Sequence, residues 1–402
     1  MPVPRFDIDL TESQRRVRES IEAICDDFDH EYWRRHAREE TYPHEFVDAL
    51  AAEGWLGVLI PESYEGKGLG TPETVVMMEE IAASGAGFGG AQTIHGGIYN
   101  SPPLVKNASP ERKETLLPKI ARGEVSIQAF GLTEPGAGSN APSMETFARR
   151  EGDEYVVSGE KMWISRVDVS DYMLLVARTS PKSAVDKRTR GISTFLIDLD
   201  DAQAQGRLHK EPIEKSASTF VNSYGLTFDD LRVPAENLIG EEGAGFYQVL
   251  DGLNEERLVI AAELIGMAEL ALSKGADYAA DREVFDQPIG ANQAIQHPLA
   301  AAHAEVQAAR QVTYEAASRS AEDSLDRESL GARANAAKYL AANAASSAAD
   351  AAVQAHGGKG IAVEYDVERY FREARLSRLV PIAQELALNY IGERELGLPR
   401  SY

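Results

Sequence analysis

The sequence of 402 residues contains one cysteine, Cys25. A single thiol forms neither an internal disulfide nor a cysteine-based metal site, so we expect a cytoplasmic protein in which Cys25 is an inert helical thiol. Runs of about 18 apolar residues are missing, and the N-terminal segment lacks the apolar stretch of a signal peptide. These absences argue against a membrane-spanning helix and predict a soluble, intracellular protein.

Positive charge is also scarce, with 41 basic against 64 acidic residues and a net charge of -23. Such a field repels phosphates and anionic lipids, so nucleic-acid and membrane partners are disfavoured. The eight histidines are scattered without metal-ligand spacing, and no metal is expected. A G-x-G-x-x-G pattern at 85–90 follows a helical stretch instead of a strand, which argues against a dinucleotide site there.

The hydrophobic periodicity divides the chain into three parts. It is helical from Thr11, a candidate N-cap, to about residue 122, has a period of two from 125 to about 237, and is helical again afterwards. The last part contains long alanine-rich segments at 246–280, 291–322, 328–355 and 366–395. We predict an α+β protein with an N-terminal helical domain (1–124), a middle antiparallel β-domain (125–240) and a C-terminal four-helix bundle (241–402).

Two motifs in the middle part carry chemistry. Residues 130–139, FGLTEPGAGS, form a strand that ends in a turn rich in backbone donors, where Thr133 and Ser139 add hydroxyls. Such a turn can bind a polar ring edge or a phosphate. Residues 161–165, KMWIS, place Trp163 and Ser165 two positions apart, so that an aromatic wall and a donor share one strand face.

Together and in this order of parts, the motifs resemble the acyl-CoA dehydrogenase family of flavoproteins over nearly the whole chain. Further segments typical of that family are IPESYEGKGLG at 60–70, REVF at 282–285 with QAIQ at 293–296, and QAHGGKG at 354–360. The resemblance implies FAD between the β-domain and the bundle, and a homo-oligomer, expected to be a tetramer of two dimers. It also implies a role in fatty acid β-oxidation, with electrons passed to an electron-transfer flavoprotein or a similar acceptor.

The resemblance assigns cofactor contacts to two sets of residues. The set expected on one subunit is Phe130, Leu132, Thr133, Gly138, Ser139, Trp163 and Ser165. The set expected from a neighbouring subunit is Arg282, Phe285, Asn292, Gln293, Gln354, Gly357 and Gly358. Asp286 stands where a glycine is common, which departs from the family pattern beside Arg282. Ser139, Asn254 and Arg257 are expected to contact the substrate.

Dehydrogenation of a thioester needs a carboxylate to remove the α-proton. Many family members carry this Glu near the C-terminus, where Pro381 stands here, whereas others carry it just before an Arg on the first bundle helix. Helical spacing puts Glu256 on the buried apolar stripe of that helix and Glu255 on its polar face. We therefore predict Glu256 as the base, with Glu385, one turn beyond Pro381, as the remaining candidate.

Two other functions stay open at this point. The same scaffold supports flavin oxidases or monooxygenases, whose reduced flavin reoxidises rapidly in air. A catalytically silent flavoprotein or assembly subunit is the other alternative, and its FAD would not bleach with any acyl-CoA. The acyl chain length and the carrier, CoA or acyl-carrier protein, are not determined by the sequence.

Overall fold

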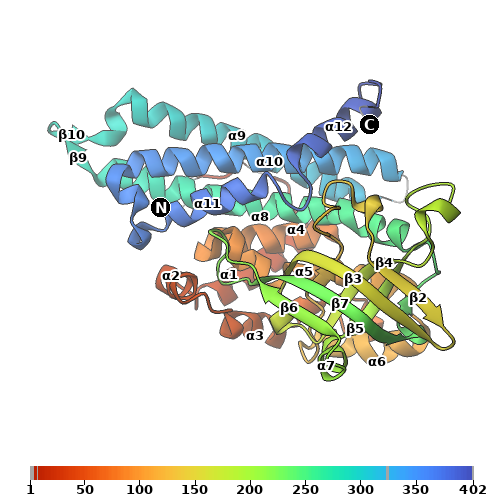
Figure 1. Ribbon diagram of the computed structural model, residues 1–402. Helices are drawn as coiled ribbons and strands as arrows, with labels where there is room; N and C mark the ends of the chain where they lie inside the picture. The colour runs from red at the N-terminus through yellow and green to blue at the C-terminus, as the bar shows by residue number, and fades with distance from the viewer. Residues whose placement is uncertain (1–3, 7, 323–325, 401–402) are drawn as a thin grey trace.

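The computed structural model describes residues 4–6, 8–322 and 326–400, with the side chains of 250 and 251 excepted. Helices come first, a β-sheet follows, and long helices complete the chain (Figure 1). This order confirms the predicted α+β fold class. None of the described helices is both long and apolar enough to cross a membrane.

Six helices form the N-terminal part. They are α1 (Glu12–Cys25), α2 (His30–Glu39), α3 (His44–Ala52), α4 (Thr71–Ile81), α5 (Gly87–Asn107) and α6 (Pro110–Ala121). The side chain of Thr11 accepts a hydrogen bond from the Gln14 backbone N–H, which makes Thr11 the N-cap of α1 as predicted. Cys25 is buried at the end of α1, and burial raises the pKa of its thiol to about 12.

The middle part is one sheet of eight strands with a short helix, α7 (Leu199–Ala204). The strands are β1 (Ala129–Gly131), β2 (Phe147–Glu151), β3 (Glu154–Ser165), β4 (Tyr172–Arg178), β5 (Ile192–Asp198), β6 (Leu208–Pro212), β7 (Ser223–Pro234) and β8 (Leu238–Ile239). The strand order is β6-β7-β3-β2-β4-β5-β8, with β1 paired to β4. The sheet is mixed and not purely antiparallel, because β1 and β2 both run parallel to β4.

Three long helices dominate the C-terminal part. These are α8 (Gly245–Asp281), α9 (Gln293–Ser320) and α10 (Arg327–His356); a hairpin of β9 (Glu283–Val284) and β10 (Gln287–Pro288) joins the first two. The segment predicted as one helix at 366–395 is divided into α11 (Val367–Ser377) and α12 (Gln384–Arg394). Pro381 lies in the break, and proline cannot continue a helix because it lacks the backbone N–H.

The three parts meet around the first half of α8. Side chains of α1, α4 and α5 share one core with α8, α9 and α10, whereas the sheet has a core of its own. A smaller cluster joins Phe246 and Val249 of α8 to Val176 and Ile192 of the sheet, with Phe130 packed against it. The beginning of α8 therefore lies against both the N-terminal helices and the end of β1.

Candidate active site

The turn after β1 is fixed by a buried ion pair between the two sequence motifs. The Lys161 ammonium contacts a Glu134 carboxylate oxygen at 2.8 Å, and the two side chains are 0% and 7% exposed. Glu134 also accepts hydrogen bonds from the backbone N–H groups of Glu145 and Thr146. Lys161 donates in addition to the Leu132 carbonyl at 2.9 Å. The motif at 130–139 is thereby held against β3.

Burial and charge act in opposite directions on this pair. Burial lowers the pKa of Lys161 to about 8, against the opposing effect of Glu134. Burial raises the pKa of Glu134, but Lys161 and the hydrogen bonds to the carboxylate outweigh it and leave that pKa below its ordinary value. The sequence analysis gave these two motif residues no role.

Trp163 lies at an irregularity in β3. The register between β3 and β7 shifts between Lys161 and Ile164, and Trp163 has a φ of 63° with a side chain that is 54% exposed. The simple alternation used to place Trp163 and Ser165 on one face is therefore interrupted by a bulge. Bulges re-aim side chains, and a positive φ is rare for a bulky residue. Ser165 lies within hydrogen-bonding distance of the Ser223 hydroxyl, 2.9 Å.

The remaining members of the first predicted cofactor set lie around the same turn. Leu132 packs against the cluster that joins the sheet to α8, and the Thr133 carbonyl accepts a hydrogen bond from the Met162 backbone N–H at 2.9 Å. Gly138 and Ser139 are exposed. A side-chain carbon added at Gly138 would meet no atom within 4 Å, so the backbone is open on that side.

Glu256 is buried on α8, as its place on the apolar stripe predicts, and is 6% exposed. Its Oε1 lies 3.6 Å from Nε2 of His95, and its buried Oε2 has no hydrogen-bond partner among the described residues. Glu255, which was predicted on the polar face, is half-buried, and its side chain lines a cavity. Every residue of α8 from 258 to 272 is buried, so this helix has no simple division into an apolar and a polar side.

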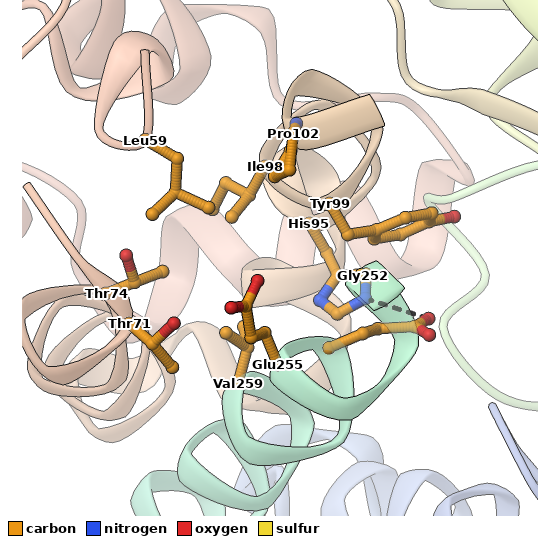
Figure 2. Close-up of a pocket in the computed structure, with 11 residues that line it drawn as sticks. Leu59, Thr71, Thr74, His95, Ile98, Tyr99, Pro102, Gly252, Glu255 and Val259 are labelled. Carbon is orange, nitrogen blue, oxygen red and sulfur yellow. Dashed lines mark ion pairs between the residues drawn. The ribbon is translucent and has the colours of Figure 1, made fainter. Parts of the chain in front are cut away.

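Both carboxylates line a cavity between α4, α5 and α8 (Figure 2). Its walls are formed by Leu59, Thr71, Thr74, His95, Ile98, Tyr99, Pro102, Gly252, Glu255, Glu256 and Val259. Figure 2 shows the Glu255 carboxylate directed into the space bordered by Thr74 and His95. The free volume is about 10 Å³, which holds roughly one water molecule. A ligand larger than a water molecule therefore fits only when lining side chains move.

His95, Tyr99 and Glu263 belong to this region and were missed by the sequence analysis. The rings of His95 and Tyr99 are 4.8 Å apart, and the Tyr99 ring lies 5.7 Å from that of Phe130. Burial raises the pKa of Tyr99 to about 12. Tyr99 thus connects the cavity to the strand that carries the first motif. His95 and Tyr99 are one helical turn apart, but Glu263 and Phe130, which they contact, are distant in sequence, so no local spacing indicated the group.

The other predicted substrate and base residues are arranged as follows. Asn254 and Arg257 lie one turn apart on α8, and the Arg257 guanidinium donates to the Asn254 side-chain oxygen at 2.7 Å. Asn254 also donates to the Arg327 carbonyl at 3.4 Å. Glu385 is exposed and accepts a hydrogen bond from the Gln384 side chain, so it is not part of the cavity.

The second predicted cofactor set lies at the opposite end of the bundle. Because α8 spans 37 residues, Arg282 at its end is about 55 Å from its beginning beside the sheet. Figure 1 shows the β9–β10 hairpin projecting at the end of the bundle that is remote from the sheet. The Tyr278 and His356 rings stack at 4.3 Å, which brings the loop that follows α10 to the same end.

All members of this second set are exposed. Phe285 is 92% exposed in the hairpin turn, and Asp286 there has a φ of 61°. Aspartate tolerates this left-handed conformation better than most residues, which accounts for its presence at a position where glycine is common. Asn292 donates to the Ile289 carbonyl at 3.1 Å. The other exposed members are Arg282, Gln293, Gln354, Gly357 and Gly358.

Comparison with known proteins decides the family. Models of the acyl-CoA dehydrogenase N-terminal, middle and C-terminal domains match residues 11–124, 129–231 and 243–396. The chain belongs to the acyl-CoA dehydrogenase family. This acyl-CoA dehydrogenase is 36% identical to FadE12 of Mycobacterium tuberculosis, an acyl-CoA dehydrogenase, over 98% of both chains.

Solved structures agree with this assignment. A glutaryl-coenzyme A dehydrogenase in complex with glutaryl-CoA is 28% identical to the dehydrogenase described here, with a TM-score of 0.89 and 98% of both chains covered. Butyryl-CoA dehydrogenase from Megasphaera elsdenii is 27% identical with a TM-score of 0.88, and the match covers 97% of this chain and 100% of that one.

The family is FAD-dependent, and the residues present fit that cofactor. The turn at 136–138 offers an unobstructed glycine backbone, since a side-chain carbon at Gly136 or Gly138 would meet nothing within 4 Å. The half-exposed indole of Trp163 supplies an apolar surface of the kind that a flavin ring stacks on. Ser139, the next residue along the turn, is exposed and carries a hydroxyl that can donate a hydrogen bond.

Proposed function

We propose that this dehydrogenase converts an acyl-CoA thioester to the trans-2-enoyl-CoA, with Glu256 as the base that removes the α-proton. FAD, when bound, accepts the hydride that leaves the β-carbon. The names of the related enzymes, butyryl-CoA and glutaryl-CoA dehydrogenase, support a CoA thioester as substrate. Which acyl group this enzyme prefers is a matter for a substrate panel.

The observation that carries the proposal is the environment of the Glu256 carboxylate. One oxygen faces His95, and the other is buried without a hydrogen-bond partner among the described residues, in the wall of the cavity. A buried acceptor with no protein donor costs free energy, and a catalytic role is one reason for a protein to keep it. A base needs such an oxygen within reach of the substrate. Glu385, the competing candidate, is exposed.

In this proposal the flavin lies beside Trp163 and the turn at 133–139, next to the beginning of α8. The second predicted set, from Arg282 to Gly358, comes from a neighbouring subunit. The length of α8 supports this division, because about 55 Å separates its two ends. The assembly we propose is a homotetramer of two dimers, in the cytoplasm, that passes electrons to an electron-transfer flavoprotein in fatty acid β-oxidation.

The test is reduction of the flavin under anaerobic conditions by butyryl-, isovaleryl-, octanoyl- and palmitoyl-CoA. With the best of these substrates, Glu256→Gln is expected to lower the rate of flavin bleaching at least about 100-fold, because a positioned base contributes roughly 100- to 10,000-fold. FAD content and acyl-CoA binding should persist. Glu255→Gln keeps the base and is expected to change substrate affinity more than the rate of bleaching, because Glu255 lines the cavity.

Three outcomes contradict the proposal in different ways. Normal bleaching in Glu256→Gln together with loss in Glu385→Gln would transfer the base to α12. Rapid reoxidation of the reduced flavin by air would indicate an oxidase or monooxygenase. A wild-type protein that binds FAD but is bleached by no acyl-CoA would be a silent flavoprotein.

A further inference from the structure

A chain of polar side chains leads from the N-terminal helices to Glu256. Gln92 of α5 donates to Oε2 of Glu263 at 2.7 Å, and Oε1 of Glu263 lies 2.6 Å from Nδ1 of His95. Nε2 of the same His95 ring lies 3.6 Å from Oε1 of Glu256. Glu256 and Glu263 are seven residues apart, two helical turns, so both face α5 from one side of α8.

The three titratable residues of this polar network, Glu263, His95 and Glu256, are all buried. Glu263 is 0% exposed, His95 2% and Glu256 6%. Burial lowers the pKa of His95, but the neighbouring carboxylates Glu263 and Glu256 outweigh burial and raise it to about 9. At neutral pH the ring is therefore an imidazolium, with both nitrogens as donors. One buried cation then lies between two buried carboxylates, and each ring nitrogen faces one of them.

We propose that His95 is a positioning residue for Glu256, held in place by Glu263. This inference rests on the proposed function, in which Glu256 is the base. The imidazolium attracts Oε1 of Glu256 and so fixes the rotation of the carboxylate, which leaves the unpartnered Oε2 to accept the α-proton. The separation of 3.6 Å exceeds a hydrogen bond, and catalytic contacts commonly shorten when substrate binds.

No proton passes through His95 in this arrangement. The α-proton moves from carbon to Oε2 of Glu256, which becomes a neutral carboxylic acid, while His95 keeps both of its protons. Glu263 keeps its two contacts, to Gln92 and His95. The contribution of His95 is orientation and charge, and small misplacements of a catalytic group cost up to about 100-fold in rate.

The pH dependence follows from the groups that face His95. These are Glu256 and Glu263 from α8 and Tyr99 from its own helix, whose pKa of about 12 keeps it neutral over the range considered. Arg166, after β3, donates to the Gln92 carbonyl and also acts on Tyr99, where its positive charge opposes the effect of burial on the pKa of the phenol. Above a pH of about 9 the imidazolium loses its proton, and flavin reduction is expected to slow down.

The experiment measures the rate of flavin reduction by stopped flow from pH 6 to 10, with the acyl-CoA of the panel that reduces the wild type fastest. His95→Gln is expected to lower the rate roughly 10- to 100-fold with little change in acyl-CoA affinity, and to abolish the alkaline decline. Glu263→Gln should move that decline to lower pH, because it removes the charge that most raises the pKa of His95. If either residue had a merely structural role, its replacement would leave the alkaline decline at its wild-type pH.

Two further variants complete the design. Glu269→Gln is the matched control, since Glu269 is a buried carboxylate on the same helix that bonds to Arg5 and Gln307 outside this chain of residues, and it should retain the wild-type pH profile. In the Glu256→Gln background, His95→Gln should cause no additional loss, because a residue that acts through Glu256 has nothing left to position.

The outcomes separate the two proposals. Loss of activity in Glu256→Gln, together with a wild-type rate and alkaline limb in both His95→Gln and Glu263→Gln, would overturn the role of His95 alone. Normal bleaching in Glu256→Gln would overturn the base and the positioning role together. An unstable His95→Gln protein leaves Glu263→Gln to decide, by whether the alkaline limb moves.

Discussion

The buried pair Lys161–Glu134 leads to a prediction on stability and cofactor retention. Glu134→Gln leaves the Lys161 ammonium, 0% exposed, without its negative partner, although the Leu132 carbonyl can still accept a hydrogen bond from it. Removing one member of a buried ion pair costs about 3–5 kcal/mol, because the other charge stays buried. At about 2–4 °C per kcal/mol, the thermal midpoint should fall by roughly 6–20 °C. FAD content should fall with it, because the pair holds the turn at 133–139.

Replacement of the other member of the pair, Lys161, is expected to cost less stability. In Lys161→Met the Glu134 carboxylate keeps its two backbone donors, at 2.6 and 3.0 Å, and no buried ammonium remains. Replacement of a buried pair by uncharged groups is often nearly neutral, so Lys161→Met added to Glu134→Gln should restore part of the lost stability. This rescue by a second substitution is the signature of a charge effect.

The same pair predicts a dependence on pH. The pKa of Lys161 is lowered from 10.5 to about 8 by burial, so between these values the unfolded chain binds more protons than the folded one. The contribution of Lys161 to stability should therefore rise with pH between about 8 and 10.5 and stay level below about 8, where the lysine is protonated in both states. Lys161→Met should remove the rise.

The assay is thermal unfolding followed by flavin fluorescence and circular dichroism on the holoenzyme. Glu151→Gln on β2 is the control, because its partner Arg149 is 61% exposed and such surface pairs contribute about 0–1 kcal/mol. The reasoning is refuted if Glu134→Gln unfolds within about 2 °C of the wild type and keeps its full FAD content.

Two further predictions concern the cofactor and the acyl chain. Phe285→Ala should lower FAD content without lowering helix content, because the Phe285 side chain is 92% exposed and contributes little to the packing of the described residues. Phe371→Ala is the control, because Phe371 is 43% exposed on the bundle and its replacement should leave FAD content unchanged. Equal FAD content in both variants would contradict a shared site. Ile98→Ala should raise the ratio of octanoyl-CoA to butyryl-CoA activity, because it enlarges the cavity. Leu50→Ala is the control, because Leu50 is buried but does not line the cavity, and it should leave the ratio unchanged. An unchanged ratio in Ile98→Ala as well would mean that the acyl chain does not occupy this cavity.

The fold was largely readable from the sequence because each part has a clear hydrophobic period. The boundaries of α8, α9 and α10 fall within a few residues of the predicted ones. Strands β2 and β6 lie within the part predicted as β, but their sequences, FARRE and LHKEP, are mostly polar and show no apolar alternation that would locate them. The break between α11 and α12 was signalled by Pro381 but was read only as the loss of a carboxylate.

The site was readable only in its local motifs. Spacing on one helix sufficed to predict the burial of Glu256, but not the position of Glu255, because that reasoning assumed solvent on one side of α8. His95 and Glu263 are 168 positions apart, so their contact depends on how α5 packs on α8. The bulge at Trp163 is likewise a property of the pairing between β3 and β7 and not of the strand alone.

The remoteness of the β9–β10 hairpin from the sheet has a genetic consequence. If each flavin site takes Trp163 from one chain and Phe285 from its neighbour, two defective chains can complement each other. A mixed dimer of a Trp163 variant and a Phe285 variant would contain one site with both lesions and one site with neither. Co-expression of two inactive alleles would then yield active enzyme, and a strain carrying both would recover a growth phenotype that neither allele supports alone.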